Sequence, residues 1–145
     1  MREIKFRGVS RETKKFVCGM LMYSTSESGL MIVETVNAPP SINDPCGDTI
    51  NIYHPIIHGT ESQYTGLKDK NGKEIYEGDI LKVYNWGPKT KDQVLGVSKV
   101  YWDADESGWN MDPNFTDGDR YDLFRNNYEI IGNLYENPEL LKAEQ

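Results

Sequence analysis

The chain has 145 residues and is poor in cysteine and in long apolar segments. Cys18 and Cys46 are its two cysteines, and they make no convincing disulfide framework. No apolar run approaches the ~20 residues that cross a bilayer, and charged residues directly follow Met1, where a signal peptide needs an apolar region. These absences predict a soluble, cytoplasmic protein with reduced cysteines. Cys18 is expected to be a core residue on a strand.

Basic residues are scarce relative to acids. The chain has 16 lysines and arginines against 23 aspartates and glutamates, a net charge of −7. Residues 63–145 carry −6 of this charge, and between residues 101 and 122 seven acids face only Arg120. Because phosphate neutralisation supplies most non-specific affinity for nucleic acids, this balance disfavours direct binding to DNA or RNA. One small basic patch is interpreted as a solvated turn and consists of Arg11, Lys14 and Lys15.

Short β-prone segments, rather than a helical period, run along the chain. Thirteen glycines and seven prolines separate them, and Asn71-Gly72 is a strong signal for a hairpin tip. A bulge is expected at Gly96. A short helix is expected at residues 137–141, where Asn caps and Pro takes the first helical position. The expected strands lie at residues 3–7, 15–18, 30–36, 49–53, 80–84, 94–102, 109–111 and 128–135.

Three blocks of sequence stand in a distinctive order. They are MREIKFR at residues 1–7, QYTGLKDKNGKEIYEGDI at residues 63–80 and EIIGNLYENPELL at residues 129–141. Their order and position resemble the YopX family of small phage and prophage proteins, over nearly the whole chain. After Arg7 the family usually has a small residue and then Trp, where this chain has Gly8-Val9. The first hairpin is therefore expected to pack differently.

The resemblance implies a β-rich protein with an SH3-like small barrel in its C-terminal part, from a phage or prophage in a bacterial cytoplasm. It brings no established activity, so no functional residue is transferred. With the strand pattern, it predicts an all-β fold with an N-terminal β-hairpin subdomain at residues 1–62, the small barrel at residues 63–145 and a short C-terminal helix. The two parts are either separate subdomains or one compact unit.

Three patterns suggest metal or acid–base chemistry, and each has a simpler structural interpretation. His54 and His58 have the i,i+4 spacing of zinc ligands, but Pro55 argues against a helix there. Residues 103–108 match the first half of a calcium loop, yet Asn114 stands where the bidentate Glu belongs, so a hairpin turn is the better account. A solvated loop, rather than a carboxylate pair, explains Glu106, Asp117, Asp119 and Asp122. We expect no catalytic residue, cofactor or metal.

Aromatic residues bracket the acidic half of the chain. They either complete the core or form a face for a partner. The leading hypothesis is a non-enzymatic module that binds a host or phage protein, with self-association through strand edges as a further option. The alternatives are a nucleic-acid-binding or DNA-mimic small barrel and, least favoured, a metal-dependent enzyme. The candidate partner-binding residues are Trp86, Tyr101, Trp102, Asp103, Asp105 and Trp109.

Overall fold

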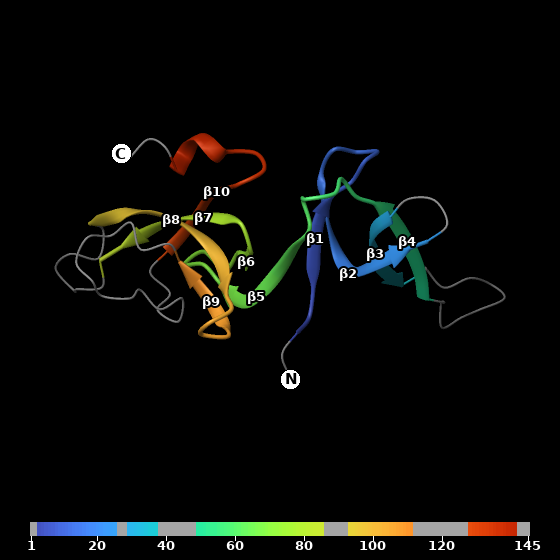
Figure 1. Cartoon of the computed structure of the whole chain (residues 1–145), viewed down its shortest axis with the longest axis horizontal. Helices are drawn as coiled ribbons and strands as arrows, with labels where there is room; N and C mark the ends of the chain where they lie inside the picture. The colour runs from blue at the N-terminus through green and yellow to red at the C-terminus, as the bar shows by residue number, and fades with distance from the viewer. Residues whose placement is uncertain (1–2, 26–28, 38–48, 86–92, 112–127, 142–145) are drawn as a thin grey trace. The chain divides into compact units, whose positions relative to one another are not determined.

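Strands dominate the part of the chain that the structure describes. The computed structural model describes residues 3–25, 29–37, 49–85, 93–111 and 128–141. Within these ranges the strands pair antiparallel, and the one helical element is a 3-10 turn, η1 (Pro138–Leu141) (Figure 1). The all-β prediction is confirmed. The predicted C-terminal helix is wrong in type, because only a single 3-10 turn forms there.

Contacts between residues divide the chain into two units, Glu3–Gln63 and Tyr64–Gln145. The division falls inside strand β5 (Ser62–Lys68). That residues 1–62 and 63–145 are separate subdomains stays a prediction, because a division of contacts does not tell whether either part folds alone.

The N-terminal unit is an antiparallel sheet in which the strands follow the order β4-β3-β2-β1-β5. The predicted first hairpin is confirmed, since β1 pairs with β2 from Phe6–Gly19 to Val9–Phe16. The longer strands β2 and β3 then continue the sheet to β4. The bounds are β1 (Phe6–Val9), β2 (Phe16–Ser24), β3 (Gly29–Asn37) and β4 (Thr49–Pro55).

The end of β4 returns to the end of β1. The backbone N–H of Arg11 donates to the carbonyl oxygen of Pro55 at 2.8 Å, and that of Ile57 donates to the carbonyl oxygen of Val9 at 2.8 Å. Ser10 and Ile56 form the bridge between them. The edge strand β4 is therefore fixed to the end of β1 over a short stretch.

Val9, Ile32 and Ile56 are the most deeply buried apolar side chains of this unit. A Cβ atom added to Gly8 would lie 2.6 Å from Cδ1 of Ile56. The close approach of Ile56 to β1 therefore requires a glycine at position 8. This packing is local to the first hairpin, where the chain departs from the pattern of the family it resembles.

Cys18 is exposed on β2, so its assignment to the core is wrong. Side chains alternate between the two faces of a strand, and Cys18 shares its face with Met20 and Met22, which are exposed as well. The residues of β2 are apolar at both odd and even positions. Such a run contains no alternation from which the buried face can be told.

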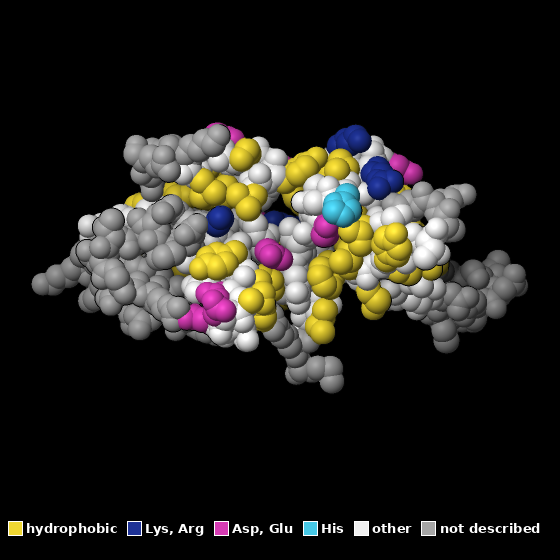
Figure 2. Space-filling model, viewed as in Figure 1, with side chains coloured by type: hydrophobic (Ala, Val, Ile, Leu, Met, Phe, Trp, Pro, Cys, Tyr) yellow, Lys and Arg dark blue, Asp and Glu magenta, His cyan; other side chains and the backbone are white. Residues whose placement is uncertain are grey.

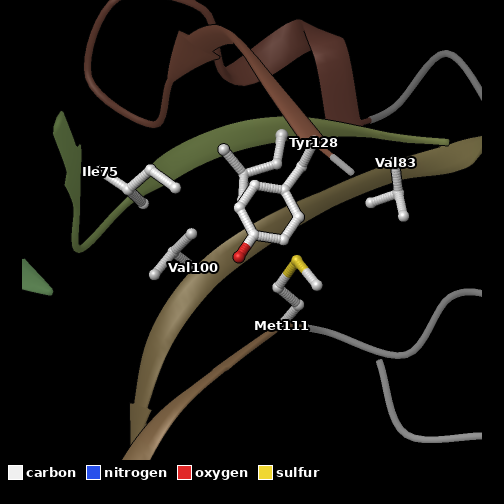
Figure 3. Close-up of a cluster of buried hydrophobic side chains, with 6 residues drawn as sticks. Ile75, Val83, Val100, Met111 and Tyr128 are labelled. Carbon is white, nitrogen blue, oxygen red and sulfur yellow. The ribbon is translucent and has the colours of Figure 1, made fainter. Parts of the chain in front are cut away.

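The C-terminal unit is built on a four-stranded antiparallel sheet with the order β10-β7-β8-β9. Figure 3 shows its core, in which the ring of Tyr128 lies among the side chains of Ile75, Val83, Val100 and Met111. The strands that supply these residues, with β5, are β6 (Glu74–Tyr76), β7 (Asp79–Tyr84), β8 (Val94–Asp103), β9 (Gly108–Met111) and β10 (Tyr128–Asn133).

The bulge expected at Gly96 is confirmed. Val83 pairs with Gly96 while Tyr84 pairs with Val94, so Leu95 is the extra residue. Gly96 has φ +153°, in the region that favours glycine. Within the described residues β9 and β10 remain the two edges of this sheet, so the strands do not close into a barrel.

The carboxylate of Asp69 organises the hairpin tip that Asn71-Gly72 predicts. Asp69 is 5% exposed. Its Oδ1 accepts the backbone N–H groups of Asn71 and Lys73, each at 2.9 Å, and its Oδ2 accepts that of Ile130 in β10 at 3.2 Å. One side chain thus closes the tip and fastens it to the last strand.

The Glu77-Gly78 turn is fixed from both sides. The N–H of Gly78 donates to the carbonyl oxygen of Val100 at 2.9 Å, and the carbonyl oxygen of Gly78 accepts the N–H of Leu134 at 2.8 Å. Buried Asp79 accepts the backbone N–H of Tyr76 at 2.8 Å. Gly78 has φ +76°, which favours glycine. The most recognisable block of the sequence therefore performs structural work in this unit.

Lys70, Tyr84 and Glu129 form a cluster on the surface of the same sheet. Lys70 Nζ lies 2.7 Å from Glu129 Oε2 and 3.8 Å from the centroid of the Tyr84 ring. The Tyr84 hydroxyl donates to Glu129 Oε2 at 2.7 Å. The hydrogen bond from Lys70, followed by that from Tyr84, lowers the pKa of Glu129 below its ordinary 4.5. The bond to Glu129 raises the pKa of Lys70 above 10.5.

Replacing Asp69 should strongly destabilise the protein. Asp69→Ala leaves three backbone N–H groups without their acceptor, which should lower the free energy of unfolding by about 3 kcal/mol. Urea denaturation measures this loss. Asp105→Ala, at an exposed turn residue, is the control and should stay within about 0.5 kcal/mol of the parent. A loss below about 1 kcal/mol for Asp69→Ala would show that the tip is held by other contacts.

The Glu129 cluster should contribute stability that depends on pH. Because the folded pKa of Glu129 is lowered, its contribution is present above pH 4.5 and is lost as the pH falls through the folded value. The difference in urea midpoint between the parent and Glu129→Gln should therefore shrink from about pH 6 to about pH 3. Glu139→Gln, at an exposed acid of η1, is the matched control. A difference that stays constant over this range contradicts the assignment.

Candidate interaction surface

The β8–β9 hairpin places most of the predicted partner-binding residues at one end of the C-terminal sheet. In its register Val100 faces Met111, Tyr101 faces Asn110 and Trp102 faces Trp109. Residues directly opposite each other in an antiparallel pair share a face. The two tryptophans therefore continue the face that buries Val100 and Met111, while Tyr101 lies on the opposite face.

The two tryptophans differ in how far their rings are buried. Trp109 packs against the core around Tyr128, and its Nε1 is buried with no hydrogen-bond acceptor among the described residues. Trp102 is 42% exposed. The ring centroids are 5.0 Å apart and the planes meet at 76°, an edge-to-face contact. Trp109 is thus a core residue, and it supports the exposed ring of Trp102.

Residues 103–108 form the hairpin turn that the sequence favours over a calcium loop. Asp103 Oδ1 accepts the backbone N–H groups of Asp105 at 3.0 Å and Glu106 at 3.3 Å, which is a common way for an aspartate to close a turn. The carboxylates of Asp105 and Glu106 are exposed. We call the set Tyr101, Trp102, Asp103, Asp105 and Trp109 the tryptophan hairpin surface.

The other candidates from the sequence are elsewhere. Trp86, Asp117, Asp119 and Asp122 lie outside the described residues, as does Cys46. His54 is on β4, where its Nε2 lies 3.2 Å from Oε2 of Glu34 on the neighbouring strand. In the described part of the chain there is no group of three or more His, Cys, Asp or Glu side chains arranged to hold a metal ion.

Exposed apolar side chains on the N-terminal unit were not predicted from the sequence. Figure 2 shows hydrophobic side chains gathered over the strands β1–β4. Met20 and Tyr23 on β2 are 71% and 70% exposed, and Ile50 and Ile52 on β4 are 48% and 41% exposed. The available signal was that apolar residues on β2 do not alternate with polar ones, so both faces of that strand carry them. Among the described residues no helix is long and apolar enough to span a membrane.

Comparison with known proteins identifies a family and a similar solved structure. A family model described as YopX protein matches residues 5–142. The crystal structure of protein EF1440 from Enterococcus faecalis is similar at 28% sequence identity with a TM-score of 0.55, covering 97% of this chain and 99% of that one. No curated protein matches the chain.

The two tryptophans should differ sharply in their effect on stability. Trp109→Ala removes a ring packed on the core and should lower the free energy of unfolding by about 3 kcal/mol. Trp102→Ala removes an exposed ring and should cost about 1 kcal/mol. Urea denaturation of the two variants measures the difference. Equal losses would mean that Trp102 is as much a part of the core as Trp109.

Proposed function

This chain belongs to the YopX family, and we propose that it acts as a non-enzymatic module that binds another protein through the tryptophan hairpin surface. One observation carries the proposal: Trp102 presents an exposed ring that is supported by the partly buried Trp109, which packs against the core. Aromatic residues in such supported positions supply a large share of the energy at protein interfaces.

The chemistry around Trp102 favours a partner segment that carries lysine or arginine. A cation above an indole face is attracted by the ring, by about 0.5–1 kcal/mol when the site is exposed. The exposed carboxylates of Asp105 and Glu106 lie on the turn beside that ring, and they add attraction at longer range. The partner is thus a host or phage protein with a basic segment, met in the bacterial cytoplasm.

Direct binding of nucleic acid is the weaker alternative. The net charge of −7 repels a phosphate backbone. In the small basic patch at the first turn, Arg11 Nε donates to the carbonyl oxygen of Ile56 at 2.8 Å, so this side chain is engaged in holding β1 to the end of β4. The other form of this alternative is DNA mimicry, in which the acidic side chains of this protein compete with DNA for binding to another protein.

The proposal extends to the strand arrangement of the C-terminal unit. We propose that residues 63–145 have an SH3-like strand arrangement, which the described strands leave open between β9 and β10. Support comes from the four-stranded antiparallel sheet, the bulge beside Gly96 and the β5–β6 hairpin, which is fastened to the sheet where the N–H of Lys70 donates to the carbonyl oxygen of Tyr128 at 3.0 Å. Such scaffolds commonly bind through their loops, but the scaffold alone assigns no function.

Affinity capture from a bacterial lysate, quantified by mass spectrometry, tests the proposal. The immobilised parent should retain a protein that Trp102→Ala retains at least about tenfold less, as expected for an anchor worth about 1.4 kcal/mol. Tyr135→Ala removes an aromatic ring that is 49% exposed elsewhere in the same unit, and it should capture as much as the parent.

The result would go against the proposal if capture by Trp102→Ala and by the parent were equal, or if the parent retained nothing. A gel shift with single- and double-stranded DNA and RNA at low salt separates the alternative. A shift that weakens as salt rises indicates direct binding. Absence of a shift, with competition between the protein and DNA for a captured protein, indicates mimicry.

A further inference from the structure

Strand β4 has an open edge. It pairs with β3 on one side and is the last strand in its sheet among the described residues. Its residues 49–53 are all exposed. An open strand edge presents backbone N–H and C=O groups to any extended segment that reaches it, and natural proteins commonly protect such edges with charges, prolines or bulges.

Bonds at the end of β4 show which backbone groups point outward. The N–H of Ile56 donates inward to the carbonyl oxygen of Leu30 on the β3 side, whereas the carbonyl oxygen of Pro55 accepts the N–H of Arg11 on the outer side. In an antiparallel pair inward and outward residues alternate. The backbone groups of Thr49, Asn51 and Tyr53 therefore point to the open edge, and Arg11 occupies it only at Pro55.

The open edge is uncharged and apolar on one face. Thr49, Ile50, Asn51, Ile52 and Tyr53 carry no charge, although the whole chain has a net charge of −7. Ile50 and Ile52 share a face with Ile32, which is fully buried. His54 lies opposite Ile32, and Ile50 and Ile52 lie four and two positions before His54, so all three residues of β4 point to the same face. Both isoleucines extend the apolar side of the sheet to its edge, at 48% and 41% exposure.

A second copy of the same strand fits this edge in one register. When Asn51 of one copy lies opposite Asn51 of the other, Thr49 of each copy pairs with Tyr53 of the other. All three outward-pointing residues of each copy are then paired. Moving the centre to Ile52 brings Pro55 into the pairing, and Pro55 has no N–H and already accepts from Arg11. If the two-fold axis passes through Ile50 instead, Thr49 pairs with Asn51 and the described strand offers no partner for Tyr53.

In the register centred on Asn51 the side chains match as well. Ile50 of one copy lies beside Ile52 of the other, twice, and the two pairs cover four exposed isoleucines. Because residues 49–53 carry no charge, no like charges face each other in this pairing. This edge differs in that respect from the acidic surface elsewhere on the chain. We propose that the protein forms a two-fold symmetric dimer by antiparallel pairing of residues 49–53 of β4 between two copies. This dimer is independent of the tryptophan hairpin surface.

Light scattering coupled to size-exclusion chromatography tests the dimer on the full chain. The parent should move from 16.6 kDa toward twice that mass as its concentration rises. Asn51→Pro removes the central outward N–H group and leaves the backbone bonds to β3 in place, while it also removes the side-chain bond that Asn51 Oδ1 accepts from Thr35 Oγ1 at 2.9 Å. Ile52→Lys keeps that bond and sets two charges beside the isoleucine pairs. Each variant should raise the dimer dissociation constant by at least about tenfold. Leu134→Lys, at a residue 43% exposed in the other unit, should leave the constant unchanged.

Hydrogen exchange of the parent gives a readout that needs no variant. The amides of Thr49, Asn51 and Tyr53 should be protected at high protein concentration and exchange quickly at low concentration, because no strand among the described residues pairs with this edge. A parent that stays at 16.6 kDa at every concentration overturns the proposal. So does a dimer whose dissociation constant neither variant changes, because it then forms through another surface.

Discussion

The carboxylate of Asp69 is the point on which the C-terminal unit depends. It accepts two N–H groups within its own hairpin tip and a third from Ile130 in β10, so a local turn and a strand about sixty residues later are held by one side chain. A buried carboxylate is costly unless its oxygens are bonded, and here both oxygens are. The turn at Gly78, bonded to Val100 and Leu134, fixes the same hairpin from its other end.

The β8–β9 hairpin extends beyond this core. The face that buries Val100 and Met111 continues outward to the facing pair Trp102 and Trp109, of which Trp109 packs against the core. A rigid sheet thus positions the exposed ring, and the ring itself carries little of the stability. Such a division allows the outer end of a hairpin to serve recognition, because changes there do not disturb the packing on which the fold depends.

Features that depend on neighbouring residues could be predicted from the sequence. Asn71-Gly72, the bulge at Gly96 and the turn at residues 103–108 each follow from backbone preferences of one or two residues. Features that depend on distant packing could not. The exposure of Cys18 is set by which face of β2 the rest of the sheet covers, and the unequal burial of Trp102 and Trp109 depends on where the core around Tyr128 ends. Residues 138–141 have good helix-start signals, but the described segment forms a 3-10 turn rather than an α-helix.

The recognisable sequence and the surfaces available to partners are therefore largely different residues. The block at residues 63–80 is occupied by turns, caps and core contacts, and a residue with three backbone bonds has little freedom to vary. The exposed ring of Trp102 and the uncharged edge of β4 have no such internal obligation in the described structure. Their chemistry differs as well: the first combines an aromatic ring with carboxylates and favours a basic partner, whereas the second offers backbone groups and isoleucines and favours a strand like itself. A protein with both surfaces can pair with its own copy and still present Trp102 to another protein, because the two contacts use residues on different strands of different units.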